Sequence, residues 1–175
     1  MGGASGSLKN RWTFGARVVA NQIPRASVRT TLTYRLLPVL SAGIEYNPRA
    51  RKASPLANWL AMGETARRPA LILGTSSDRI GTPSGQSFYA TVSKNLRRET
   101  KLPIAPYFGV AYGTYEDRAR AIGGMSVGFT ESLNSLIIFD GVHVHPTLNF
   151  SWRRHVFTFL LVRGKHPGAS YSIGF

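Results

Sequence analysis

Hydrophobic and polar residues alternate with a period of two along most of this chain. Between residues 25 and 36 the odd positions are polar or basic, whereas the even positions are mostly apolar and include Tyr34. An α-helix would mix these two sets, whereas a β-strand places them on opposite faces. Residues 12–20 and 40–47 divide in the same way. Three such strands joined by short links predict an antiparallel up-and-down meander.

Further strand-like segments follow at short and regular spacing. We expect them near residues 57–64, 69–76, 86–95, 103–113, 118–129, 133–140, 142–151, 155–163 and 167–175. Glycine, proline and other turn residues separate them. Together with the first three segments they make about twelve strands and predict an all-β, up-and-down antiparallel barrel. Ten strands would result if residues 58–64 were helical or if residues 133–151 were one bent hairpin, and eight would also close a barrel.

Two segments, residues 70–73 and 156–162, are apolar on both faces. Contact with a plug or a loop inside a narrow barrel explains this pattern, and a partly dry lumen is the alternative.

The length of 175 residues predicts one domain. Residues 1–10 are rich in glycine and serine and predict a flexible lead-in, so we assign the barrel to residues 11–175. The first residues lack a basic region followed by an apolar one, so they do not form a secretory signal. We therefore expect a mature form or a fragment of a longer product.

The aromatic residues predict which face of the barrel wall points outward. A membrane-spanning barrel has an apolar outer band edged by aromatic girdles and a polar interior, whereas a soluble barrel has the reverse. Four aromatic residues lie at strand ends in register with the apolar face: Trp12, Tyr34, Tyr46 and Trp152. Small residues on the opposite face suit a crowded interior: Gly15, Gly43, Gly124, Ser126 and Gly128. These positions favour a transmembrane barrel.

Composition narrows the choice of partner. The 22 Lys and Arg residues against 8 Asp and Glu residues give a net charge of +14. The cations are spread along the chain rather than clustered, so we expect no nucleic-acid partner.

No apolar run approaches the roughly 18–20 residues of a transmembrane helix. The absence of cysteine excludes disulfides and thiolate metal sites.

The last ten residues resemble the sorting signal of bacterial outer-membrane β-barrel proteins. The chain ends inside a strand, with an aromatic last residue and apolar residues two and four positions before it. The matching positions are His166, Gly168, Tyr171, Ile173 and Phe175. The resemblance implies a location in the bacterial outer membrane, periplasmic termini and contact with the barrel-assembly machinery during biogenesis. It identifies no particular subfamily.

An outward apolar face would send a mainly basic set of side chains into the lumen. The candidates are Arg17, Arg29, Arg35, Glu45, Glu64, Arg118, Arg120, His143 and His145. In one interpretation Arg17 or Arg29 pairs with Glu45 across neighbouring strands and plugs a narrow barrel, since charges in a bore of low dielectric constant need partners. In the other, the cations line a pore that favours anions.

Candidate chemistry is sparse. His143 and His145 share one strand face, but no third ligand suggests itself, so we expect no metal and no cofactor. Residues 74–83 include Ser76, Ser77 and Asp78. One of these serines would be a nucleophile, supported by Asp78 and by His143 or His145. The same residue types are ordinary in loops, so we assign no catalytic residue. Residues 81–85 lack the following Lys-Ser/Thr of a phosphate-binding loop.

These observations predict an outer-membrane barrel that acts as a passive pore or small-solute channel with a basic, anion-favouring lumen. The alternative is a non-conducting barrel that anchors or binds a partner at the surface or in the periplasm. A lipid-modifying enzyme and a soluble ligand-binding barrel are the remaining alternatives. We expect extracellular loops near residues 48–56, 77–85, 113–117 and 163–167, and periplasmic turns near 65–69, 96–102 and 152–154. Arg51 and Lys52 would contact outer-membrane lipid or lipopolysaccharide phosphates, if they are not simply solvated.

Overall fold

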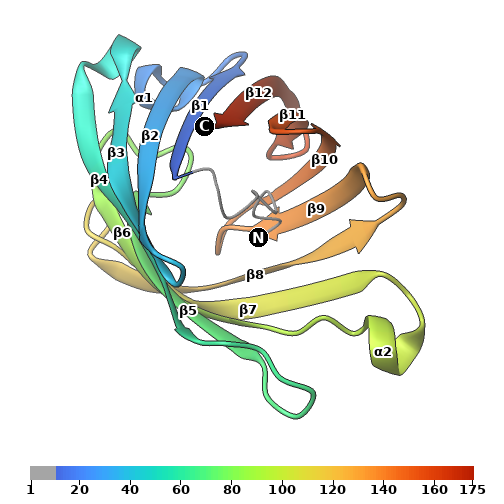
Figure 1. Cartoon of the computed structure of the whole chain (residues 1–175). Coiled ribbons are helices and arrows are strands. Elements are labelled where there is room, and N and C mark those ends of the chain that lie inside the picture. The colour runs from blue at the N-terminus through green and yellow to red at the C-terminus, as the bar shows by residue number, and fades with distance from the viewer. Residues whose placement is uncertain (1–10) are drawn as a thin grey trace.

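Twelve antiparallel strands form a closed barrel in the computed structural model, which describes residues 11–175 (Figure 1). The predicted lead-in, residues 1–10, lies outside the described residues. The strands are β1 (Trp12–Val19), β2 (Val28–Leu37), β3 (Leu40–Asn47), β4 (Lys52–Met62), β5 (Ala70–Ser77), β6 (Gln86–Ser93), β7 (Ile104–Gly113), β8 (Arg118–Gly128), β9 (Leu133–Phe139), β10 (Val144–Trp152), β11 (His155–Val162) and β12 (His166–Gly174). Each pairs with its neighbours in the chain, and β12 closes the ring by pairing with β1. The predicted all-β, up-and-down barrel of twelve strands is thus confirmed.

The alternatives with fewer strands are wrong for a local reason. Residues 58–62 continue β4 rather than turning into a helix, because Asn58 and Trp59 pair with β3 and β5 on either side. Residues 133–151 contain two strands, β9 and β10, separated by a turn at Gly141 with φ of +90°.

The two ends of the barrel differ in their loops. We call the end that holds Trp12 and Phe175 the terminal end; these residues exchange two backbone hydrogen bonds of 2.9 Å. The loops 38–39, 63–69, 94–103, 129–132 and 153–154 lie at the same end, and 94–103 contains the short helix α2 (Arg97–Thr100). The loops at the other end, here called the far end, are 20–27, 48–51, 78–85, 114–117, 140–143 and 163–165.

Register separates the side chains of every strand into an outer and an inner set. Phe14, Leu32 and Ile44 are register neighbours on the outer face and are all exposed. Their sequence neighbours on the inner face are small or polar, as predicted from the alternation. Gly43 faces Thr33, and Gly124 lies beneath the ring of Tyr107.

Two segments depart from their predicted form. Residues 25–27 form part of a helical turn, α1 (Pro24–Ser27), rather than the start of β2. Pro24 stands in the first turn, where its fixed φ and missing N–H are tolerated. The predicted loop at 48–56 is much shorter, because β4 begins at Lys52 directly after the turn η1 (Pro48–Ala50). No helix among residues 11–175 is long and apolar enough to cross a bilayer.

Gly43 offers a test of the inner packing. A Cβ there would overlap the carbonyl oxygen of Leu32 and lie 2.6 Å from Thr33 Cα, so Gly43→Val would push two strands apart. We expect it to lower the free energy of unfolding by about 1–3 kcal/mol, measured by denaturant titration of the folded chain. Gly63→Ala is the matched control, because nothing lies within 4 Å of a Cβ at that position. Equal effects of the two substitutions would contradict the described packing.

Candidate functional site

Four of the predicted lumen residues gather on the inner wall toward the far end. Arg17, Arg29 and Glu45 come from the adjacent strands β1, β2 and β3, and His145 comes from β10. Arg29 Nε lies 2.6 Å from Glu45 Oε2, and the Glu45 side chain is only 1% exposed. Glu45 Oε1 accepts a hydrogen bond of 2.9 Å from Asn47 Nδ2. The predicted pairing of a lumen arginine with Glu45 is therefore confirmed for Arg29.

A loop folds across the far end, and the sequence did not identify which loop this is or which residues hold it. We call residues 78–85, which join β5 to β6, the plug loop. Arg25, from α1, is 6% exposed and donates hydrogen bonds to it: Nε to the Thr82 carbonyl at 2.6 Å, and Nη2 to the Arg79 carbonyl at 2.7 Å. Nη2 also lies 2.8 Å from Thr82 Oγ1. One buried guanidinium thereby satisfies backbone carbonyls that would otherwise be costly to bury.

The plug loop also reaches the opposite wall. Its Ile80 packs against an apolar cluster of Val19, Leu160 and Val162, which project inward from β1 and β11. In the strand order, β11 lies across the ring from β5. The apolar inner residues of segment 156–162 therefore contact a loop, as one of the two interpretations of that segment predicted.

An ion-pair network fastens the plug loop to its neighbour, loop 114–117. Arg79 Nη2 pairs with Glu116 Oε1, and Arg120 Nη2 lies 2.8 Å from Glu116 Oε2. The hydrogen bonds from Arg79 and then Arg120 lower the pKa of Glu116 to about 2. Asp78 adds a second tie, because its Oδ2 accepts a hydrogen bond of 3.2 Å from the Tyr115 backbone N–H.

His145 is held by partners at both ring nitrogens. Nε2 lies 2.9 Å from Asp140 Oδ2, and Nδ1 accepts a hydrogen bond of 3.1 Å from the Arg163 backbone N–H. The neutral ring with its proton on Nε2 satisfies both contacts, and it leaves no nitrogen free to take a proton from a serine. Ser76 Oγ instead donates to the Ser77 carbonyl at 3.2 Å. The His145–Asp140 pair therefore supports the far end rather than a serine nucleophile.

No group of three or more metal-ligating side chains occurs among residues 11–175. His143 lies in the turn after β9, with its ring centroid 6.5 Å from that of His145.

Two cavities share Arg17 and Arg29. The first, of about 220 Å³, is lined toward the far end by Arg25, Glu45 and the plug loop. The second, of about 260 Å³, lies against β12, β1 and β2 and is lined by Gly15, Ala16, Arg17, Arg29, Thr31, Ser170, Tyr171 and Ser172. Arg17 and Arg29 therefore contribute to the walls of both cavities.

The remaining predicted lumen residues lie at the barrel ends. Arg35 takes the inward register near the terminal end of β2, and Arg118 is exposed at the far end. Arg120 lies at the far end and is engaged by Glu116. Glu64 does not line the lumen, because β4 ends at Met62 and leaves Glu64 exposed in loop 63–69.

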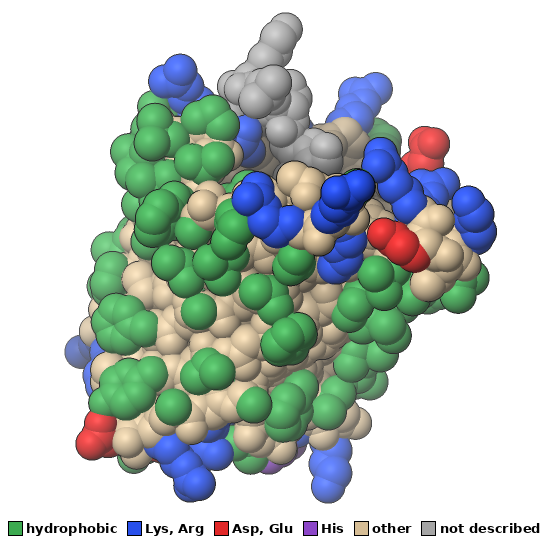
Figure 2. All heavy atoms as spheres, turned by 90° about the horizontal axis from the view of Figure 1, so that it is seen from below, with side chains coloured by type: hydrophobic (Ala, Val, Ile, Leu, Met, Phe, Trp, Pro, Cys, Tyr) green, Lys and Arg blue, Asp and Glu red, His purple; other side chains and the backbone are tan. Residues whose placement is uncertain are grey.

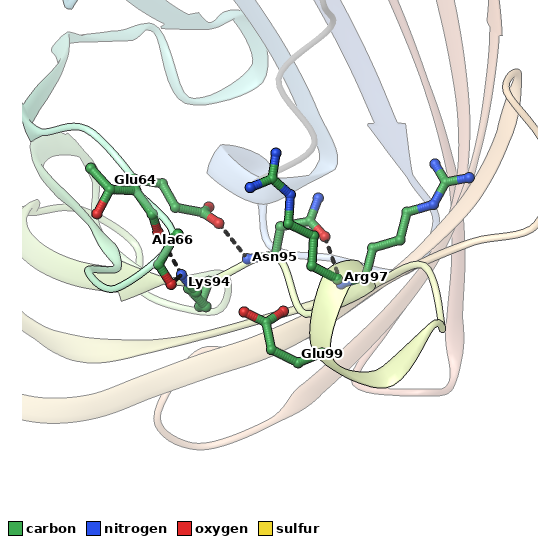
Figure 3. Close-up of a pocket in the computed structure, with 8 residues that line it drawn as sticks. Glu64, Ala66, Lys94, Asn95, Arg97 and Glu99 are labelled. Carbon is green, nitrogen blue, oxygen red and sulfur yellow. Dashed lines mark hydrogen bonds between the residues drawn. The ribbon is translucent and has the colours of Figure 1, made fainter.

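Glu64 instead belongs to a surface cavity of about 520 Å³ at the terminal end, formed between loops 63–69 and 94–103 (Figure 3). Its Oε1 accepts a hydrogen bond of 3.1 Å from the Asn95 backbone N–H. Lys94 Nζ donates to the carbonyls of Thr65 and Ala66 at 2.6 and 2.8 Å. These contacts tie the two loops to each other, which gives the cavity walls a structural role.

Three of the four predicted girdle residues lie at the terminal end. The rings of Trp12 and Tyr34 lie 4.7 Å apart, and Trp152 is 56% exposed with Arg153 over its ring. Tyr46 is exposed near the far end. Four further exposed aromatic residues were not in the predicted girdle: Trp59, Phe88, Tyr112 and Tyr115.

The residues that match the sorting signal divide between the two faces of β12. Tyr171 pairs in register with the exposed Phe157 on the outer face, and Ile173 follows two positions later. His166 and Gly168 pair with Val162 and Leu160 on the inner face. Their role in assembly stays a prediction.

No protein-family model matches this sequence, and no curated protein is detectably similar to it. The geometry of the chain therefore carries the argument on function.

The Glu116 network predicts a pH-dependent stability. A carboxylate whose pKa is lowered on folding stabilises the folded state above its ordinary pKa of about 4.5, and this contribution is lost as the pH falls from there toward about 2. We expect Glu116→Gln to lower the unfolding free energy at pH 6, with a difference from wild type that shrinks at pH 2.5. Denaturant titrations at both pH values measure it, with Glu131→Gln, at the terminal end, as the control. A difference that does not depend on pH would contradict the ion-pair assignment.

Proposed function

We propose that this chain is a membrane-spanning β-barrel of the bacterial outer-membrane type that serves as a pore for small anions. The observation that carries the proposal is the register of the charged side chains. Every charged residue within the strands takes an inward position or lies at a strand end: Arg17, Arg29, Arg35, Glu45, Lys52, Arg118 and Arg120. A barrel in water would carry charges on its outer wall, where they are solvated without cost.

The outer surface supports the same proposal. Figure 2 shows apolar side chains over the wall of the barrel, with Lys and Arg side chains gathered above and below them. Phe108 is 70% exposed in the middle of β7, and Val110, two positions on, is 53% exposed. Contiguous exposure of large apolar groups on a soluble surface is unfavourable, whereas lipid chains accommodate it.

The ends of the barrel fit the interfaces of a bilayer. Aromatic residues with a polar tip lie near both ends, including Trp12 and Tyr46, and such residues suit the level of the lipid headgroups. The resemblance of the last strand implies a periplasmic terminal end, which would leave the plug loop on the extracellular side. Lipid or lipopolysaccharide and the assembly machinery are the partners that this proposal requires.

The charge of the inner wall decides the solute class. The cavity toward the far end has four arginines, Arg17, Arg25, Arg29 and Arg79, against three carboxylates, Glu45, Asp78 and Asp140. The neighbouring cavity has Arg17 and Arg29 and no carboxylate, so the inner wall attracts anions. The plug loop favours a second candidate, a barrel that does not conduct, because it spans the far end and is held by Arg25 and Ile80. In the pore proposal this loop is the gate.

A single lysine substituted on the outer wall tests whether that wall faces lipid. We expect Phe108→Lys to lower the unfolding free energy in phospholipid vesicles by about 2–4 kcal/mol, because a lysine would lie at the depth of the hydrocarbon core. The control is Leu102→Lys at the terminal end, where Leu102 is 57% exposed and a cost of about 0–1 kcal/mol is expected. In a soluble barrel both substitutions would change stability by less than about 0.5 kcal/mol, and this result would refute the membrane proposal.

Conduction is tested in planar bilayers. We expect brief, infrequent openings of the wild-type chain, with chloride more permeant than potassium. Arg25→Ala removes the hydrogen bonds that hold the plug loop and should raise the open fraction at least severalfold, whereas Arg49→Ala, on the exposed rim, should not. If neither the wild type nor Arg25→Ala conducts, the pore proposal fails and the non-conducting barrel stands.

A further inference from the structure

The cavity of about 260 Å³ against β12, β1 and β2 contains cations and hydroxyl groups but no carboxylate. Arg17 and Arg29 are register partners on neighbouring strands, and both take inward positions. Two like charges directly opposite each other repel, so this arrangement needs a compensating negative charge.

The nearby carboxylate, Glu45, forms a direct ion pair with only one of the two arginines and attracts Arg17 from a longer distance. Glu45 Oε2 lies 2.6 Å from Arg29 Nε, and its other oxygen is engaged by Asn47. Arg17 forms no ion pair with a carboxylate of residues 11–175, and its Nε is buried without a hydrogen-bond partner among them. Residues 1–10 contain no Asp or Glu, so their side chains bring no carboxylate to Arg17.

The rest of the cavity wall supplies neutral hydrogen-bond donors. Register places Ser170 opposite Arg17, and it places Thr31 and Ser172 on either side of Gly15. A Cβ at Gly15 would lie 2.7 Å from Thr31 Oγ1, so glycine keeps this part of the wall open. A guanidinium beside several hydroxyl groups is a donor set for an oxyanion, since arginine offers paired N–H groups to two oxygens at once.

We propose that this cavity binds a small oxyanion, of the size of inorganic phosphate, between Arg17 and the hydroxyl groups of Thr31, Ser170 and Ser172. The volume is several times the roughly 30 Å³ of a water molecule, which leaves room for a phosphate group. The ligand is a free solute rather than a lipid headgroup, because the cavity lies on the inner face of the wall. This site deepens the proposed function, as a place where a permeating anion would pause.

The proposal is tested by calorimetric titration of inorganic phosphate into the full chain in zwitterionic detergent at low ionic strength. We expect saturable binding with one phosphate per chain, competition by sulfate, and at least a tenfold loss of affinity in Arg17→Gln. Arg118→Gln is the matched control, because it removes the same charge from the exposed far end. Equal losses in the two variants would show attraction to net charge only and would overturn the site, as would the absence of saturable binding to the wild type.

A second variant covers the case in which Arg17→Gln does not fold. Ser170→Ala combined with Ser172→Ala keeps both cations and removes two hydroxyl donors, and we expect it to weaken phosphate binding severalfold. Unchanged affinity in this variant would contradict the described donor set. Because the titration needs no bilayer, loss of the site and failure of the pore proposal are separate results: a chain that conducts anions without saturable phosphate binding would overturn only the site.

Discussion

Closure of the hydrogen-bonded ring is the constraint on which the rest of this structure depends. Once β12 pairs with β1, every strand has a hydrogen-bonded neighbour on both sides and the sheet has no free edge strand. Closure also turns the alternation of the sequence into an inside and an outside. Each side chain in a strand then faces either the lumen or the outer surface. A register shift of one position would turn every side chain of that strand to the other face. The inner glycines show how little room closure leaves, because Gly43 sits where any side chain would meet the neighbouring backbone.

The inward register places charged side chains inside the barrel, where they need ion-pair or hydrogen-bond partners. Arg29 and Glu45 form an ion pair, and Asn47 donates a hydrogen bond to the same carboxylate. Arg25 instead donates hydrogen bonds to backbone carbonyls of the plug loop. Arg17 lines both cavities, but among the described residues it has no ion pair and its buried Nε has no hydrogen-bond partner. The proposed anion pathway and the proposed oxyanion site both rest on this cation, which forms no ion pair among residues 11–175.

The plug loop connects these features. It receives Arg25 from one side, sends Ile80 to the apolar cluster on the opposite wall, and is tied by Arg79 to Glu116 in the next loop. The far end therefore depends on a few contacts between separate strands and loops, rather than on a continuous core. The proposed gate can therefore be released by removing one side chain without disturbing the wall, since the wall is held by its own backbone hydrogen bonds.

The sequence by itself indicated most of the strands, a number near twelve and the two faces of the wall, because a period of two is a local property of consecutive residues. It also indicated that a lumen arginine would pair with Glu45, since those residues stand on neighbouring strands. Only the tertiary structure decided that Arg25 leaves the strand pattern and binds Thr82, 57 residues later, or that Ile80 meets Leu160 across the ring. Such contacts depend on which loops meet at one end of a closed ring, and no local period records that. For the same reason Glu64, assigned to the lumen by its place near a strand, lies on the rim where β4 has already ended.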